Sequence, residues 1–138
     1  MREIKFTIKG NQDDPLGNPY PYARILKGSK KPAAVKYRAW GVYVRTQYHK
    51  KHKEDITLQK LSWAEMSREK PLTSSKECPA KMDIEIFFAN DARGDCDNIY
   101  KGIADALFHN DKYIMEGSFK GIVSPDKVGL VNVRIEVA

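Results

Sequence analysis

The chain has few cysteines, no long hydrophobic run and no low-complexity segment, and each shortage excludes a class of protein. Its two cysteines, Cys78 and Cys96, form no Cys-x-x-Cys pair, so neither a disulfide framework nor a four-ligand zinc site is expected. No apolar stretch approaches the roughly 18 residues of a transmembrane helix, and the first residues lack the apolar centre of a signal peptide. We therefore expect a soluble, cytoplasmic protein that does not contact membranes.

The length and composition are those of one globular domain. The chain has 138 residues, of which 41% are hydrophobic and 30% are charged. This composition is too apolar for a disordered chain and too polar for a membrane protein. We expect residues 1–138 to form a single domain around one core.

The net charge of +6 is distributed unevenly along the chain. Residues 30–60 contain nine Lys or Arg and two acids, whereas residues 83–111 contain seven acids and two basic residues. A basic segment suits a polyanion, and an acidic cluster in the same domain repels that polyanion unless cations lie between them. A metal-dependent nuclease needs both a basic segment that binds DNA and an acidic cluster that holds cations. Two solvated charged faces would give the same numbers of acidic and basic residues.

Hydrophobic periodicity predicts an α+β fold. Alternating apolar residues indicate strands at 3–8, 82–88, 113–123 and 128–137, and the last two are expected to form a hairpin. Helical spacing predicts helices at about 33–52 and 97–109, with Asp97 capping the second, and a short helix is plausible near 62–66. Residues 10–31 are rich in Pro and Gly and predict a long loop of the kind that contacts a partner. We expect a two-layer α/β arrangement in which a mixed or antiparallel sheet of about four strands is covered by two helices.

Candidate chemistry is concentrated between Gly94 and Asp111. Asp95 and Asp97 stand where a loop becomes a helix, and Asp111 follows that helix. Three carboxylates brought together would form an oxygen-rich pocket suited to Mg²⁺, which activates water and neutralises charge on a phosphodiester. Lys101 would then contact the scissile phosphate or the attacking water as an electrostatic partner.

Other interpretations of the same residues are open. Asp97 would serve equally as a helix cap, and Lys101 with Asp105 would make a surface ion pair worth about 0.5 kcal/mol. Alternating acids in the loop also suggest a Ca²⁺-binding module, but Arg93 interrupts the series. Asn98 and Gly102 stand where that module needs Gly and Glu.

The longer string Gly-Asp-x-Asp-Asn-x-x-Lys-x-x-x-Asp-Ala-Leu, followed closely by an acid, resembles the signature of RusA-type Holliday junction resolvases. The resemblance implies catalytic roles for Asp95, Asp97, Lys101 and Asp111, with the three aspartates as metal ligands. It further implies Mg²⁺ or Mn²⁺ dependence, a homodimer, and paired nicks across a four-way DNA junction in recombination and repair, in a bacterial or phage setting. The opening strand, the basic loop, the Lys- and Tyr-containing helix and the closing strands are similar to the family as well.

Junction binding would rest mainly on phosphate contacts, for which the basic segment supplies the candidates. These candidate DNA contacts are Lys30, Lys31, Lys36, Arg38, Arg45, Lys50, Lys51 and Lys53. The main competing hypothesis is a non-catalytic DNA-binding protein of the same fold, in which the basic segment binds and the acids only cap and pair.

Overall fold

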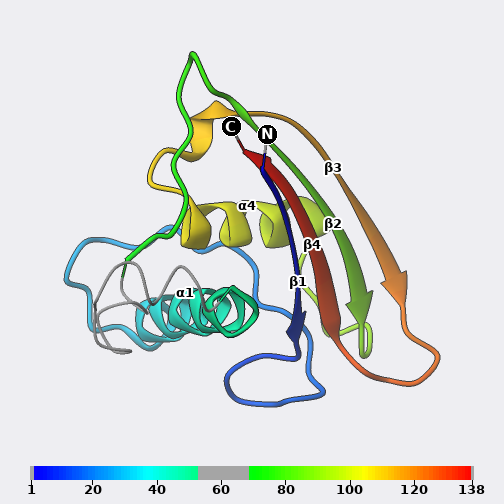
Figure 1. The fold of residues 1–138 in the computed structure, drawn as a ribbon. Coiled ribbons are helices and arrows are strands. Elements are labelled where there is room, and N and C mark those ends of the chain that lie inside the picture. The colour runs from blue at the N-terminus through cyan, green and yellow to red at the C-terminus, as the bar shows by residue number, and fades with distance from the viewer. Residues whose placement is uncertain (1, 53–68, 138) are drawn as a thin grey trace.

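A computed structural model describes residues 2–52 and 69–137 (Figure 1). The predicted short helix near residues 62–66, and Lys53, lie outside these residues. The predicted α+β architecture is confirmed, because a four-stranded mixed sheet and two helices form one small two-layer domain. In chain order the elements are β1 (Arg2–Lys9), α1 (Pro32–Lys51), β2 (Ala80–Phe88), α4 (Cys96–Leu107), the 3₁₀ helix η1 (Asp111–Tyr113), β3 (Ile114–Val123) and β4 (Leu130–Val137).

The strand order of the sheet is β1-β4-β2-β3, and it corrects the predicted hairpin. β3 pairs in parallel with β2, while β4 lies antiparallel between β1 and β2. The unit β2-α4-β3 is a crossover, which is how two parallel neighbours are connected. The chain then passes the end of β2, where the Ser124 N–H donates to the Phe88 carbonyl at 2.7 Å, and enters the sheet on the other side of β2.

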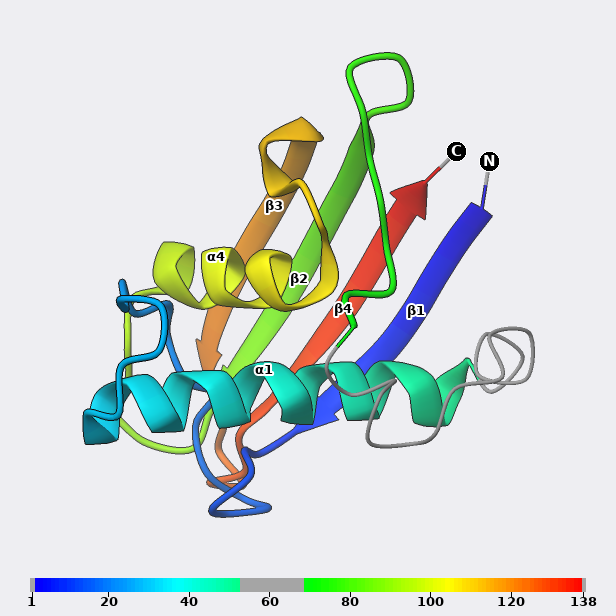
Figure 2. The ribbon, with the colours of Figure 1, turned by 90° about the vertical axis from the view of Figure 1, so that its left-hand side faces the viewer.

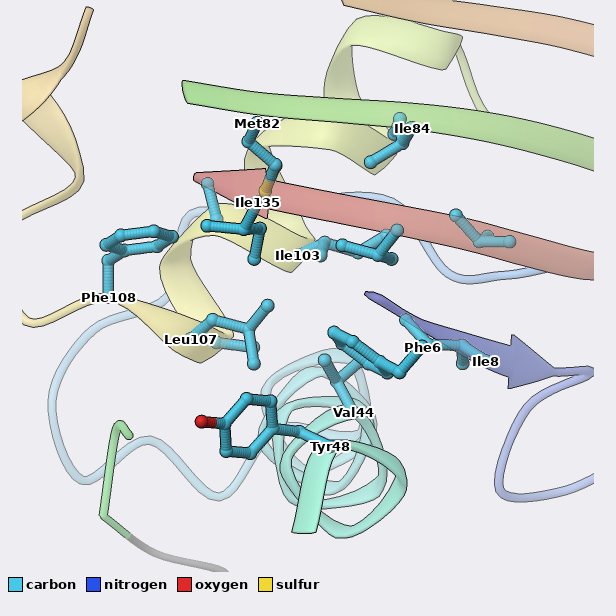
Figure 3. Close-up of a cluster of buried hydrophobic side chains, with 14 of the residues drawn as sticks. Phe6, Ile8, Val44, Tyr48, Met82, Ile84, Ile103, Leu107, Phe108 and Ile135 are labelled. Carbon is cyan, nitrogen blue, oxygen red and sulfur yellow. The ribbon is translucent and has the colours of Figure 1, made fainter. Parts of the chain in front are cut away.

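Both helices cover one face of this sheet (Figure 2). Alternate residues of β1, Ile4, Phe6 and Ile8, are buried beneath them, as the period-two pattern predicts. Side chains from both layers meet in the core, where Val44 and Tyr48 of α1 approach the sheet (Figure 3). Burying each large apolar side chain of this kind stabilises the fold by about 1.5–3 kcal/mol.

The opposite face of the sheet carries polar and charged side chains. Arg134 on β4 is its central cation and makes ion pairs with Glu3 at 2.9 Å and Glu136 at 2.6 Å. It also approaches Asp83 on β2 at 3.5 Å. Asp83 therefore lies on the face that α4 does not cover, and it takes no part in the acidic group around α4.

The helix boundaries follow local signals. α1 begins at Pro32, whose fixed φ suits the first helical position, and Lys50 and Lys51 lie in its last turn, where cations are favourable. Within residues 2–52 and 69–137, neither helix is long and apolar enough to cross a membrane.

Candidate functional site

The N-terminal end of α4 carries the first two predicted site residues. Asp95 is the N-cap residue, and its carbonyl accepts a hydrogen bond from the Ile99 N–H at 3.0 Å. The prediction that Asp97 caps this helix is wrong, because Asp97 lies in the first turn. Neither carboxylate makes a hydrogen bond or ion pair within the described part of the chain, and both residues are exposed. The carboxylates of Asp95 and Asp97 therefore do not cap the helix.

The two faces of α4 are separated as the sequence predicts. The stripe of Ile99, Ile103, Ala106 and Leu107 is buried, with exposed fractions from 0% to 4%. Asp97 and Lys101 stand four residues apart on the opposite, exposed face. The Lys101 ammonium lies 4.2 Å from the centre of the Tyr22 ring, a cation–π contact that holds it above the surface of α4.

Asp105 does not pair with Lys101, so the surface ion pair that the sequence left open as an alternative is not formed. Its carboxylate instead accepts a hydrogen bond from the Tyr37 hydroxyl at 2.7 Å and lies 3.3 Å from the Lys70 ammonium. Burial raises the pKa of Tyr37, and the hydrogen bond to Asp105 raises it further. Asp105 therefore ties α4 to α1, which is a structural reason for an acid at this position.

Asp111 lies at the other end of α4 from Asp95 and Asp97. It begins η1, after the helix has ended at Leu107, and a 12-residue α-helix is about 18 Å long. Its charge makes a small contribution to the raised pKa of Tyr37, after burial and the hydrogen bond to Asp105. In residues 2–52 and 69–137 no three His, Cys, Asp or Glu side chains are placed to hold a metal ion. The residues described in one chain thus do not form the three-carboxylate pocket that Mg²⁺ or Mn²⁺ was expected to occupy.

The long loop at residues 10–31 is packed against this site. The Asn18 side chain accepts a hydrogen bond from the Ala89 N–H at 2.6 Å and donates to the Ala92 carbonyl at 2.9 Å, which fixes the segment leading to Asp95. Farther along, the Tyr22 N–H donates to the Asn98 carbonyl at 2.8 Å. The sequence predicted that the loop contacts a partner, but it did not single out Asn18 and Tyr22, because only the fold brings these residues to α4 and the segment before it.

Gly94 is needed for this packing. A Cβ at Gly94 would lie 2.8 Å from the Cβ of Pro21, closer than real contacts allow. The glycine of the Gly-Asp-x-Asp string therefore has a local structural cause, which is the close approach of the loop at Pro21.

A pocket of about 430 Å³ opens beside this face of α4. It is lined by aromatic and charged side chains from the loop, both helices and the segment before β2, among them Tyr22, Tyr37, Arg38, Arg45, Lys70 and Asp105. Tyr22 and Tyr37 meet edge to face with ring centres 5.5 Å apart. The candidate site is thus an exposed acid pair and a lysine on α4, bordered by a pocket of tyrosines and cations.

The predicted DNA contacts are spread over α1 and the residues before it. Lys30, Lys31, Lys36 and Arg38 are exposed near its first turns, and the Lys36 ammonium lies 4.1 Å from the Tyr20 ring centre. Lys50 and Lys51 are exposed at the far end of a 20-residue helix about 30 Å long. Arg45 differs from these residues, because it is 9% exposed and donates to the Ala106 carbonyl at 3.0 Å. Its guanidinium contributes mainly to helix packing.

A scan of the sequence against protein-family models finds no match, and a search among curated proteins finds none either. The resemblance to the RusA-type resolvases therefore stays a prediction that depends on the residues between Gly94 and Asp111.

Proposed function

We propose that this protein is a structure-specific endodeoxyribonuclease that cuts four-way DNA junctions and belongs functionally with the RusA-type resolvases. The observation that carries the proposal is the N-terminal half of α4, which presents exposed Asp95, Asp97 and Lys101 beside the loop whose Tyr22 N–H bonds to the Asn98 carbonyl. Neither aspartate side chain makes a hydrogen bond or ion pair within the described residues, as expected of groups kept available for chemistry.

The charges around α4 suit a phosphodiester. Lys101 presents an ammonium group that neutralises charge developing on phosphate. Lys36 and Arg38 extend the positive surface onto α1. A DNA backbone could therefore follow the loop at residues 10–31 between α4 and α1. The acids would repel that backbone unless cations lie between them. Dependence on Mg²⁺ or Mn²⁺ is therefore part of the proposal, although no three potential ligands come together among residues 2–52 and 69–137 of one chain.

One observation favours a second candidate, a non-catalytic DNA-binding protein of the same fold. Asp111 lies at the opposite end of α4 from the acid pair, so in a single chain the three aspartates do not act on one phosphate. In that case the basic surface binds branched DNA and the aspartates perform no hydrolysis.

Cleavage of labelled DNA tests both candidates. A synthetic four-way junction, a linear duplex of the same sequence and a single strand are incubated with Mg²⁺, Mn²⁺ or EDTA. The wild type is compared with Asp97→Asn and with the matched control Asp91→Asn, which removes an exposed acid from the preceding loop. Binding is measured separately for each protein in EDTA.

We expect symmetric nicks in the junction alone, lost in EDTA and in Asp97→Asn but kept in Asp91→Asn, while junction binding survives in all three proteins. Binding without cutting under either metal would refute the enzyme and favour the DNA-binding candidate. Absence of junction binding would contradict both.

A further inference from the structure

The pocket of about 430 Å³ lies between α1 and α4, which run side by side over the sheet (Figure 2). α1 contributes Tyr37, Gly41 and Arg45, which stand four residues apart and so share one face of the helix. Asp105 lies across from them on α4, and Tyr22 comes from the loop. The carboxylates proposed for cleavage are not part of the described lining, so the pocket is distinct from the acid pair.

Gly41 is an unusual residue for the middle of a 20-residue helix, because glycine is less favourable than alanine in a helix interior. Its cause lies in the pocket wall. A Cβ at Gly41 would lie 3.2 Å from Nη1 and 3.4 Å from Nη2 of Arg45, so a side chain here would crowd the guanidinium. Gly41 therefore leaves space for the guanidinium of Arg45 to lie along α1 at the pocket.

The pocket gathers positive charge. Among the described residues that line it, Arg38, Arg45 and Lys70 are opposed by one acid, Asp105. Arg45 is only 9% exposed, and a positive charge that is largely removed from water favours an anion close to it. Arg38 is exposed and donates to the Ser29 carbonyl, but a guanidinium carries five N–H donors, so others remain for a ligand. The charges of the pocket therefore suit a phosphate group.

Two aromatic rings also give the pocket a flat apolar surface. Tyr22 and Tyr37 are both partly exposed, and their rings meet edge to face with centres 5.5 Å apart. Aromatic side chains stack on nucleobases of any sequence, because every base has a π face. Aromatic rings beside cations are therefore complementary to a ligand that carries both a planar base and a phosphate, which is a nucleotide.

Tyr22 connects the pocket to the candidate active site. Its ring lines the pocket, and the Lys101 ammonium lies 4.2 Å from the ring centre. A strand whose phosphate contacts Lys101 would therefore bring a neighbouring nucleotide to the pocket. The faces of paired bases are hidden within the duplex stack, so only an unpaired nucleotide can enter, and unpairing costs least where the duplex is already interrupted. A branch point supplies such a position.

We infer that the pocket between α1 and α4 binds one unpaired nucleotide of the DNA strand that crosses Lys101. The base lies against the rings of Tyr22 and Tyr37. Arg38 contacts the phosphate, and the charge of Arg45 supports it. The source of the nucleotide rests on the proposed function, whereas the binding of a nucleotide depends on the pocket alone. Recognition of this kind selects unpaired DNA without reading its sequence.

Titration with a free nucleotide tests the pocket without any cleavage. Amide NMR spectra of the labelled protein are recorded in EDTA with deoxyadenosine monophosphate, deoxyadenosine or inorganic phosphate. The monophosphate should shift the amides of Ala23, Gly41 and Ala106 saturably. It should bind about tenfold more tightly than either of the others, because it alone uses both the rings and the cations. Absence of these shifts would overturn the inference, and so would equal binding of inorganic phosphate.

A carboxylate placed at the pocket should repel the phosphate. Val42 lines the pocket and is 37% exposed, so Val42→Glu adds a negative charge there without disturbing the core. Val35→Glu is the matched control, because Val35 is exposed on the same helix but is not among the described residues of the lining. We expect the affinity for deoxyadenosine monophosphate to fall about fivefold in Val42→Glu and to change by less than about twofold in Val35→Glu. Thermal unfolding checks that both variants fold, and equal losses of affinity in the two would overturn the inference.

Abasic sites in the DNA test the source of the nucleotide. A series of four-way junctions lacks one base at a time around the branch point, and the affinity of each junction is measured in EDTA. At one position, loss of the base should weaken binding to the wild type about tenfold. Tyr22→Phe keeps the ring and should keep this penalty, whereas Tyr22→Leu should lose most of it. If no position shows such a penalty although the free nucleotide binds, the ligand does not come from the DNA strand and the inference is overturned.

Both measurements are made without metal, so they are separate from the test of hydrolysis. A protein that binds the nucleotide but cuts no junction refutes the proposed nuclease and leaves the pocket as a nucleotide site. A protein that cuts junctions but binds no nucleotide overturns only the inference drawn from the pocket.

Discussion

The hydrogen bond between Tyr37 and Asp105 offers a direct test of how α1 and α4 are joined. Tyr37→Phe removes only the hydroxyl and keeps the ring that packs on Tyr22. The lost bond is 2.7 Å long, partly buried and accepted by a carboxylate, and bonds to charged groups contribute about 1.5–3 kcal/mol. We expect the free energy of unfolding to fall by about 2 kcal/mol, and the melting temperature by roughly 6 °C.

A double-mutant cycle assigns this loss to the pair. Asp105→Ala also removes the partly buried Lys70 contact, which contributes about 1 kcal/mol. Urea unfolding of Tyr37→Phe, Asp105→Ala and the double variant should give a coupling energy of about 2 kcal/mol between the two positions. Tyr113→Phe is the control, since its hydroxyl has no hydrogen-bond partner in the described residues. A loss below about 0.5 kcal/mol in Tyr37→Phe, or additive effects in the cycle, would refute the reasoning.

The same pair should make stability depend on alkaline pH. The pKa of Tyr37 is raised by burial and by Asp105, whereas an unfolded tyrosine ionises near pH 10. The Tyr37 hydroxyl therefore holds its proton more tightly in the folded state than in the unfolded state. The resulting stabilisation of the folded state is complete below about pH 10 and is lost as the pH rises further. Tyr37→Phe should flatten that decline.

Three further predictions concern the packing around α4. Gly121→Ala places a Cβ 2.5 Å from the Cys96 sulfur and should lower the free energy of unfolding by about 1–3 kcal/mol in urea. Adding Cys96→Ala should recover most of this loss, and no recovery would show that the strain lies elsewhere. Asn18→Ala removes the side-chain hydrogen bonds to Ala89, Asn90 and Ala92 in the segment before Asp95 and should speed amide exchange at Ala89; unchanged exchange would contradict its role. Burial raises the pKa of Tyr100 to about 12, so the wild type should lose more stability than Tyr100→Phe between pH 10 and 12 in denaturant titrations, and equal losses would exclude this cause.

The sequence alone determined the elements and the faces that they bury. The stripe of Ile99, Ile103 and Leu107 and the alternation of Ile4, Phe6 and Ile8 arise from the periods of helix and strand, so local pattern was sufficient. It also determined that Asp97 and Lys101 share the exposed face of α4, because residues four apart on a helix must do so.

The tertiary structure alone decided which strands pair and which acids meet. The turn before β4 predicted a hairpin, but α4 connects β2 to a parallel β3, and β4 takes the place between β1 and β2. Only the fold brings Arg134 of β4 to Asp83 on the exposed face of the sheet, and it leaves Asp111 at the far end of α4 from Asp95 and Asp97. Contacts between distant segments, such as Asn18 with Ala92 and Tyr37 with Asp105, select this arrangement, and their energies depend on separations in space that no local period encodes.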